Sequence, residues 1–84
     1  MSHREQIRSF ILENFLLTAE PNALADDTSL SDAGIIDSAG MLEIVMYLEQ
    51  EWGIEVADEE MLRENFDSVA GIAAFLSRKR AASG

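Results

Sequence analysis

Residues 34–52 read GIIDSAGMLEIVMYLEQEW, and they hold the most strongly periodic run in the chain. The spacing predicts a helix over residues 38–52, and Gly53 is its expected stop because glycine adopts the left-handed conformation without steric cost. One side of this helix carries apolar residues at the intervals of a buried stripe. The stripe consists of Met41, Ile44, Val45, Leu48 and Trp52. Ser38 therefore stands where an irregular segment ends and a core helix begins.

The other positions of this predicted helix fall into two groups. The residues opposite the stripe, where we expect solvent, are Glu43, Tyr47 and Gln50. The residues between these two faces are Ala39, Leu42 and Met46. Leu42 and Met46 either broaden the core stripe or form an exposed surface that accepts several partners, and the spacing leaves both alternatives open.

The rest of the chain predicts an all-α domain. A first amphipathic helix is expected over residues 2–17 and a last one from 69 to about 80, with Ser68 as its N-cap and residues 81–84 frayed. Residues 58–62 have the composition of one or two helical turns. The inner faces of the first and last helices are expected to be Ile7, Phe10, Ile11 and Phe15, and Val69, Ile72, Ala73 and Leu76. Residues 1–84 are therefore expected to form one helical domain.

Residues 18–37 form a long connection without periodicity, with Pro21 and Asn22 among its turn residues. A connection of this length in a small domain tends to be functional. The apolar residues that we expect to pin it to the core are Leu24, Leu30, Ile35 and Ile36. Its acidic part does not fit a calcium loop, because the sixth position counted from Asp27 is Asp32, where such a loop needs glycine. We interpret it as a solvated acidic loop.

The composition narrows the classes of function. A chain of 84 residues buries only about 60–65% of its unfolded surface, which leaves little core for an internal active site. Sixteen Asp and Glu against six Lys and Arg give a net charge of −10, which disfavours nucleic acid and anionic membranes and favours partners with basic docking patches. Cysteine is absent, and no apolar run approaches the roughly 18 residues of a membrane span. We expect a cytoplasmic, monomeric protein that acts through its surface.

The only histidine and the basic cluster of the last helix have structural explanations. His3 has no acidic or cysteine partner at metal-ligand spacing, so we expect a solvated side chain and no metal site. Arg78, Lys79 and Arg80 crowd the end of the last predicted helix, where the helix dipole favours cations. We interpret this cluster as a helix-end feature and not as a nucleic-acid patch.

Ser38 is a poor candidate for a catalytic nucleophile. A hydrolase needs a general base beside the hydroxyl, and His3 carries the only imidazole in the chain. A helix N-terminus offers unpaired N–H groups and a positive dipole end, which suit a phosphoryl group on the serine oxygen. Ser38 or Asp37 can also simply be the N-cap of the helix, and the spacing alone favours that simpler role.

Three segments together resemble an acyl carrier protein, over about residues 4–77. They are GIIDS at residues 34–38, LEQEWGIEV at residues 48–56 and DSV at residues 67–69. Members of this family are four-helix bundles with three main helices, a short third helix and a long loop between the first two. The resemblance implies that Ser38 carries 4'-phosphopantetheine, transferred from coenzyme A by a separate magnesium-dependent transferase. The reactive thiol would then come from the cofactor, which explains why a chain without cysteine can carry a thioester.

The resemblance also assigns roles to further residues and partners. Asp37 would help the transferase to place coenzyme A and its metal, and no residue would be catalytic. The docking surface would consist of Ala39, Glu43, Met46, Glu49 and Gln50, with Glu51 at its flank. An acyl chain would tuck in near Leu42, Val56 and Met61. The acyl group would pass from a loading ligase or transferase to downstream enzymes of lipid or secondary-metabolite biosynthesis.

The sequence departs from the family pattern at three positions. Ala39 stands where a leucine is common, Gly40 where an acid is common and Ala57 where a proline is common. The segments DSAG at residues 37–40 and ENFDS at residues 64–68 look closer to carriers of specialised pathways, such as those loaded by an adenylate-forming ligase or those that carry aminoacyl groups. The alternatives are an acidic helical adaptor without a prosthetic group and a small hydrolase, for which the chain offers no base.

Overall fold

The computed structural model describes residues 3–18, 20 and 23–83, and for residues 82 and 83 the backbone alone. Ser2, the turn residues Pro21 and Asn22, and Gly84 of the predicted frayed end lie outside the described residues. In the described ranges the chain forms helices and no strand. The elements are α1 (His3–Ile11), the π-helical turn η1 (Leu12–Leu16), α2 (Ser38–Trp52), the 3₁₀ turn η3 (Asp58–Glu60), α3 (Arg63–Phe66) and α4 (Val69–Ser83).

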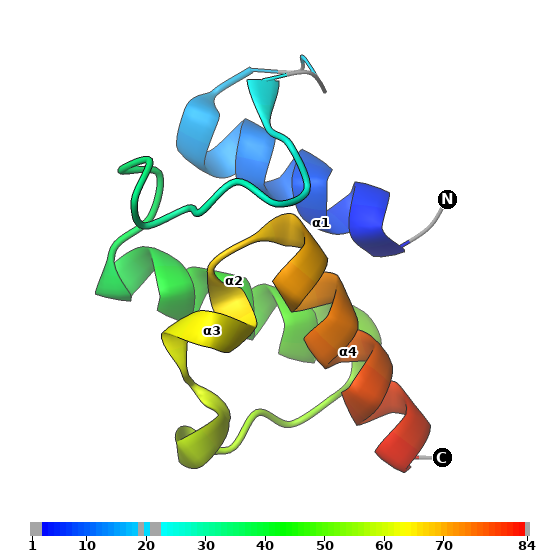
Figure 1. Ribbon diagram of the computed structural model, residues 1–84. Coiled ribbons are helices and arrows are strands. Elements are labelled where there is room, and N and C mark those ends of the chain that lie inside the picture. The colour runs from blue at the N-terminus through cyan, green and yellow to red at the C-terminus, as the bar shows by residue number, and fades with distance from the viewer. Residues whose placement is uncertain (1–2, 19, 21–22, 84) are drawn as a thin grey trace.

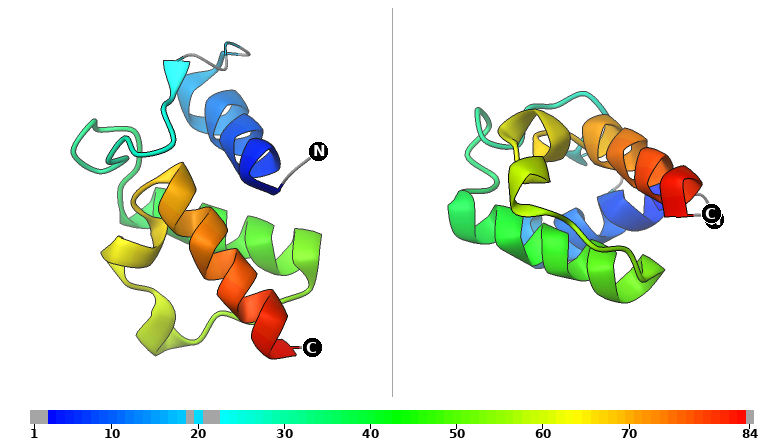
Figure 2. Two further views of the ribbon diagram at one scale, coloured as in Figure 1. Left: turned by 45° about the vertical axis from the view of Figure 1, so that its right-hand side comes forward. Right: turned by 90° about the horizontal axis from the view of Figure 1, so that it is seen from below.

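The helices form the predicted bundle, with three main helices and a short third one. Helix α4 packs against α1 and α3, and it crosses α2 in Figure 1 and in the left view of Figure 2. From residue 23 onward, the connection runs round one side of the bundle to the start of α2 (Figure 1). In the described part of the chain, no helix is both long and apolar enough to cross a membrane.

The core is built from the predicted stripes. The residues of these stripes that are buried are Ile7, Ile11, Ile44, Val45, Leu48, Val69, Ile72, Ala73 and Leu76, and Phe10, Phe15, Met41 and Trp52 pack against them half-buried. Leu24 and Leu30 of the long connection are buried as well, and Ile35 and Ile36 pack at the edge. Phe66 and Phe75, which the sequence had not singled out, lie 5.0 Å apart between ring centroids inside this core. Because Leu24 and Leu30 are buried, the long connection is anchored to the core, as predicted.

The first helix has the predicted extent but not the predicted form throughout. It is α-helical only to Ile11 and continues as the wider turn η1 to Leu16. The side chain of Asn14 donates a hydrogen bond to the Phe10 carbonyl at 2.8 Å, and such competition with the backbone ladder disturbs an α-helix. The helix stops at Leu17, whose φ is 53°.

Two side chains that we expected in solvent are partly buried. Tyr47 stacks on Phe10 with ring centroids 4.0 Å apart, because α1 covers this side of α2. Burial, with the carboxylates of Glu51 and Glu13, raises the pKa of Tyr47 above its ordinary value. His3 is half-buried, and its Nε2 lies 3.2 Å from the Ser77 hydroxyl, so its side chain is less exposed than we expected.

The third helix and the basic cluster also differ from expectation. The predicted turns at residues 58–62 form only as η3, and the α-helical turn follows at α3. Helix α4 continues beyond Arg80 to Ser83, so Arg80 is the one member of the basic cluster that lies in its last turn. Arg78 donates to Asn65 at 3.2 Å and Lys79 binds Glu60 at 2.8 Å, and the Lys79 hydrogen bond lowers the pKa of Glu60. These basic residues tie α4 to the η3–α3 segment.

Candidate functional site

The start of α2 is capped by Asp37 and not by Ser38. Asp37 has an extended backbone, and its Oδ1 accepts a hydrogen bond from the Gly40 N–H at 2.9 Å. Its carbonyl accepts from the Met41 N–H, also at 2.9 Å. This is the geometry of an N-cap residue, which the sequence left open between Asp37 and Ser38. Because Asp37 fills the role, the Ser38 side chain is not needed for it.

Ser38 is the first residue of α2, and it is exposed. Within the described residues its hydroxyl has no hydrogen-bond partner, and neither do the N–H groups of Ser38 and Ala39. Unpaired N–H groups at a helix start carry the positive end of the helix dipole. Ser38 therefore presents a free oxygen at a place that favours negative charge.

A groove of about 320 Å³ opens beside Ser38. It is bounded by the end of the long connection, the first turn of α2, and α3 with the residue that follows it. Its lining residues are Ser31, Ile36, Asp37, Ser38, Met41, Arg63, Phe66 and Asp67. The groove thus combines an apolar wall with charged side chains next to the free hydroxyl.

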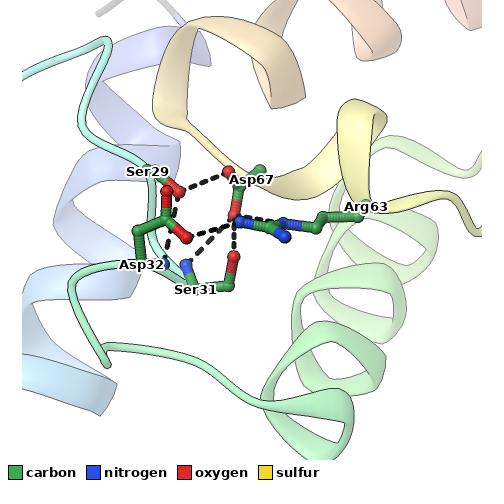
Figure 3. A network of polar contacts seen from close by, with 5 residues as sticks. All are labelled: Ser29, Ser31, Asp32, Arg63 and Asp67. Carbon is green, nitrogen blue, oxygen red and sulfur yellow. Dashed lines mark hydrogen bonds and ion pairs between the residues drawn. The ribbon is translucent and has the colours of Figure 1, made fainter.

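One wall of the groove is held by a polar network around Asp67 (Figure 3). The Asp67 carboxylate accepts from the Ser29 hydroxyl at 2.5 Å, from the Ser31 hydroxyl at 2.6 Å and from the Ser31 N–H at 3.0 Å. Arg63 Nε lies 3.7 Å from Asp67 Oδ1, and Arg63 Nη2 lies 2.7 Å from Asp32 Oδ1. Burial acts to raise the pKa of Asp67, but the hydrogen bonds from Ser29 and Ser31 hold it below its ordinary value. The network joins the loop before α2 to the segment after it.

Gly40 lets this loop pack tightly on α2. A Cβ atom built on Gly40 would lie 3.1 Å from Ile36 Cβ and 3.1 Å from Phe15 Cε1. Such contacts are closer than ordinary van der Waals packing, so a side chain here would push the loop away. The departure from the family pattern at Gly40 therefore has a structural reason in this chain.

The predicted docking surface is largely exposed. Leu42 is 50% exposed and Met46 is 55% exposed, so neither residue broadens the buried core stripe. The exposed members of the predicted docking surface are Ala39, Glu43, Met46 and Gln50, and Leu42, predicted for the acyl pocket, is exposed beside them. These residues form an accessible acidic and apolar face that starts next to Ser38.

Glu49 differs from the rest of the predicted docking surface. It is half-buried, and its Oε2 accepts a hydrogen bond from the Val56 N–H at 3.0 Å. The carboxylate thereby fastens the segment after α2 to the last turns of that helix. Glu49 thus has a structural contact that the sequence did not predict.

The predicted acyl-pocket residues lie elsewhere than the groove beside Ser38. Leu42 is exposed, whereas Val56 and Met61 are half-buried at the edge of the core. None of the three is among the residues that line the groove. Ser31, Arg63 and Asp67 could not be selected from the sequence as site residues, because Ser31 and Asp67 meet across 36 residues and no local pattern links them. Only the family likeness of residues 64–68 drew attention to this region.

In the part of the chain that the structure describes, no metal-binding cluster lies beside Ser38. In the described residues no group of three His, Cys, Asp or Glu side chains could hold a metal ion. His3 packs edge-on against Trp52, the last residue of α2, at the end opposite Ser38. The only imidazole in the described residues therefore does not lie beside the Ser38 hydroxyl.

Comparison with known proteins identifies the class. The phosphopantetheine attachment site family (PP-binding) matches residues 7–76, so this chain belongs to that family of carrier proteins, which carry 4'-phosphopantetheine and are not themselves catalysts. The prediction of the family, of its fold and of its cofactor is confirmed.

Individual relatives support the same assignment. The chain is 38% identical over 58 residues to D-alanyl carrier protein 1 of Lactiplantibacillus plantarum, covering 69% of this chain and 72% of that protein. It is 34% identical over 77 residues to an acyl carrier protein of Akkermansia muciniphila, covering 92% and 91%. The solved structure of KstB-PCP(apo) matches with a TM-score of 0.77 and 36% identity, covering 93% of this chain and 86% of that one.

Proposed function

We propose that Ser38 is the residue to which 4'-phosphopantetheine is attached. The observation that carries this proposal is the free, exposed Ser38 hydroxyl at the first position of α2, where Asp37 already provides the cap. The unpaired N–H groups of Ser38 and Ala39 suit a phosphate on the serine oxygen. The residues at the site therefore fit the group that the family carries.

The chemistry of attachment requires little of this chain. The Ser38 oxygen would form a bond to the phosphorus nearest pantetheine in coenzyme A, and the pyrophosphate link would break. The adenosine bisphosphate half would leave, and the hydroxyl proton would pass to a base that the transferase supplies. The attached group supplies a thiol that can carry an acyl group as a thioester. Asp37 would keep α2 capped throughout and so hold Ser38 in place, and we propose that it also helps the transferase.

We further propose that the protein passes an acyl or aminoacyl group between enzymes of a specialised biosynthetic pathway. One relative is named a D-alanyl carrier protein and others are named acyl carrier proteins, which supports both classes of cargo. The partners would be a phosphopantetheinyl transferase, a loading ligase or transferase, and enzymes that use the product. A cytoplasmic location, a monomeric state and an acyl site near Leu42, Val56 and Met61 stay predictions.

The partners would dock on the exposed face of α2. A net charge of −10 favours basic surfaces on these enzymes. Each exposed ion pair contributes only about 0–1 kcal/mol, which suits a carrier that must leave each partner quickly. Glu43 and Gln50 would supply polar contacts there, and Leu42 and Met46 would supply apolar ones.

The proposal is tested by incubating the protein with coenzyme A and a transferase of broad specificity, followed by mass spectrometry. We expect a mass gain of one phosphopantetheinyl group, which Ser38→Ala should abolish. Ser77→Ala, which removes another exposed hydroxyl far from the site, should keep the gain. No gain in the wild type, or a gain that persists in Ser38→Ala, would contradict the proposal. The acidic-adaptor alternative would then predict that Ser38→Ala keeps full function in its pathway.

A further inference from the structure

Arg63 is the positively charged side chain of the groove beside Ser38. Among the residues that line this groove it is the only cation, in a chain with a net charge of −10. The two carboxylates of the lining already have partners, since Asp37 accepts from Gly40 and Asp67 accepts from Ser29 and Ser31. An anion that entered the groove would therefore find one side chain of opposite charge, the Arg63 guanidinium.

The partner that Arg63 holds in this structure is easily replaced. Its ion pair with Asp32 is open to solvent, with 60% of the Arg63 side chain and 76% of the Asp32 side chain exposed. Exposed ion pairs add little net stability. The contact to Asp67 is a 3.7 Å ion pair. A guanidinium has five N–H donors in a planar fork that matches two oxygens of a phosphate as well as those of a carboxylate, so a phosphate in the groove can take the place of Asp32.

The rest of the groove suits the part of the attached group that lies next to the phosphate. In phosphopantetheine, a carbon that bears two methyl groups lies close to the phosphoester. The wall of the groove contains Ile36, Met41 and Phe66, and it is mainly apolar. The phosphate and the branched carbon would thus meet a cation and an apolar wall, respectively, within one groove.

We propose that Arg63 binds the phosphate of the group on Ser38 and releases Asp32 to do so. The inference rests on the proposed attachment at Ser38. In the unmodified chain Arg63 would pair with Asp32, and in the modified chain it would pair with the phosphate. The first part of the phosphopantetheine group would then lie in the groove instead of moving freely in solvent.

A purely structural role for Arg63 is the competing explanation. Arg63 could serve only to hold Asp32 and Asp67, and thereby the loop, against α3. That role predicts the same Arg63 contacts before and after modification. The two explanations therefore predict different chemical environments for the phosphate and for the guanidinium once Ser38 is modified.

The test compares fully loaded proteins, with loading verified by mass. The ³¹P chemical shift of the attached phosphodiester is measured in the folded protein and in urea, and the Arg63 Nε–Hε resonance is followed before and after loading. In the wild type we expect a ³¹P shift that differs from the urea value and approaches it as salt is raised from about 0.05 to about 0.5 M. We also expect the Arg63 resonance to move on loading.

Three variants sharpen the comparison. Arg63→Gln should lose the difference between the folded and urea ³¹P shifts. Arg80→Gln removes the same charge from an exposed position of α4 that does not line the groove, and it should keep the difference. Asp32→Asn removes the competing carboxylate, so it should enlarge the difference.

The outcomes separate this inference from the proposed function. Failure to load Ser38 would overturn both. Normal loading with the same ³¹P shift in wild type and Arg63→Gln, or with an unmoved Arg63 resonance, would overturn only the phosphate contact. If circular dichroism shows that Arg63→Gln is unfolded, the Arg63 resonance of the wild type and the ³¹P shift of Asp32→Asn decide the question.

Discussion

Asp37 and Ser38 are neighbours in the chain, and the structure gives them different tasks. Asp37 accepts the Gly40 N–H and so satisfies the start of α2. Ser38 contributes its backbone to the helix and leaves its hydroxyl free. Both residue types cap helices well, so the sequence alone could not divide these roles. The extended backbone of Asp37 in the structure identifies Asp37, and not Ser38, as the capping residue.

The capping role leads to a stability prediction. Asp37→Ala should lower the free energy of unfolding by about 1 kcal/mol because the Gly40 N–H loses its acceptor. Asp37→Asn should unfold close to the wild type, since asparagine caps equally well. Urea denaturation followed by circular dichroism measures both values. Equal losses in the two variants would show that the charge, and not the cap, matters for stability.

The elements differ in how well the sequence predicts them. Helix α2 has the predicted bounds, and Gly53 stops it with a φ of 67°, because its periodicity and its stop signal are local features. Tyr47 was assigned to the wrong environment, because the position of α1 over it is not encoded in the period of α2. The turn η1 was missed for a similar reason, since the bond from Asn14 to Phe10 competes with a ladder that the periodicity assumes.

The residues of the candidate site could likewise be predicted from the sequence only where a local pattern marks them. Ser38 could be selected because a helix start and a family pattern both mark it. Arg63 and Asp67 could not, because their partners Asp32 and Ser31 lie 31 and 36 residues away in the chain. Contacts of this kind depend on how the elements fold back on one another.

Glu49 offers a prediction about the element after α2. Glu49→Ala should lower the free energy of unfolding by about 1 kcal/mol or more, because the half-buried Val56 N–H loses its acceptor. Glu51→Ala removes the same charge from an exposed position of the same helix and should change stability by less than about 0.5 kcal/mol. Thermal or urea unfolding of the two variants makes the comparison. Similar losses would mean that Glu49 contributes through charge alone.

At the scale of the whole molecule, Asp67 joins the part of the chain before α2 to the part after it. Ser29 and Ser31 donate to its carboxylate, and its carbonyl accepts from the Leu30 N–H at 2.6 Å. These bonds place the long loop beside the α3 segment and thereby form the groove at Ser38. The stability of the fold and the shape of the site thus depend on the same carboxylate.

The protonation of Asp67 should therefore affect the whole fold. Its pKa in the folded chain lies below the ordinary value of 3.8, so its stabilising effect is present above that pH and is lost as the pH falls through the folded-state pKa. We expect the free energy of unfolding to fall more steeply in this acid range for the wild type than for Asp67→Asn. Urea unfolding at a series of pH values measures the slopes.

A matched variant controls for the change in net charge. Asp27→Asn removes one exposed carboxylate of the same long loop and should keep the slope of the wild type in the acid range. Parallel pH dependences for the wild type and Asp67→Asn would contradict the role given to the Asp67 network.

The contact between His3 and Ser77 has a practical consequence for measuring this protein. It places the start of α1 beside the last turns of α4, and His3 also touches Trp52 at the end of α2. Ser38 stands at the other end of α2, which has 15 residues and so spans roughly 20 Å. Figure 1 shows the first described turn of α1 and the last turn of α4 on the side away from the start of α2. A fluorescent label or a surface tether near His3 or on the last turns of α4 would leave Ser38 facing solution, so partner enzymes could be studied on immobilised protein.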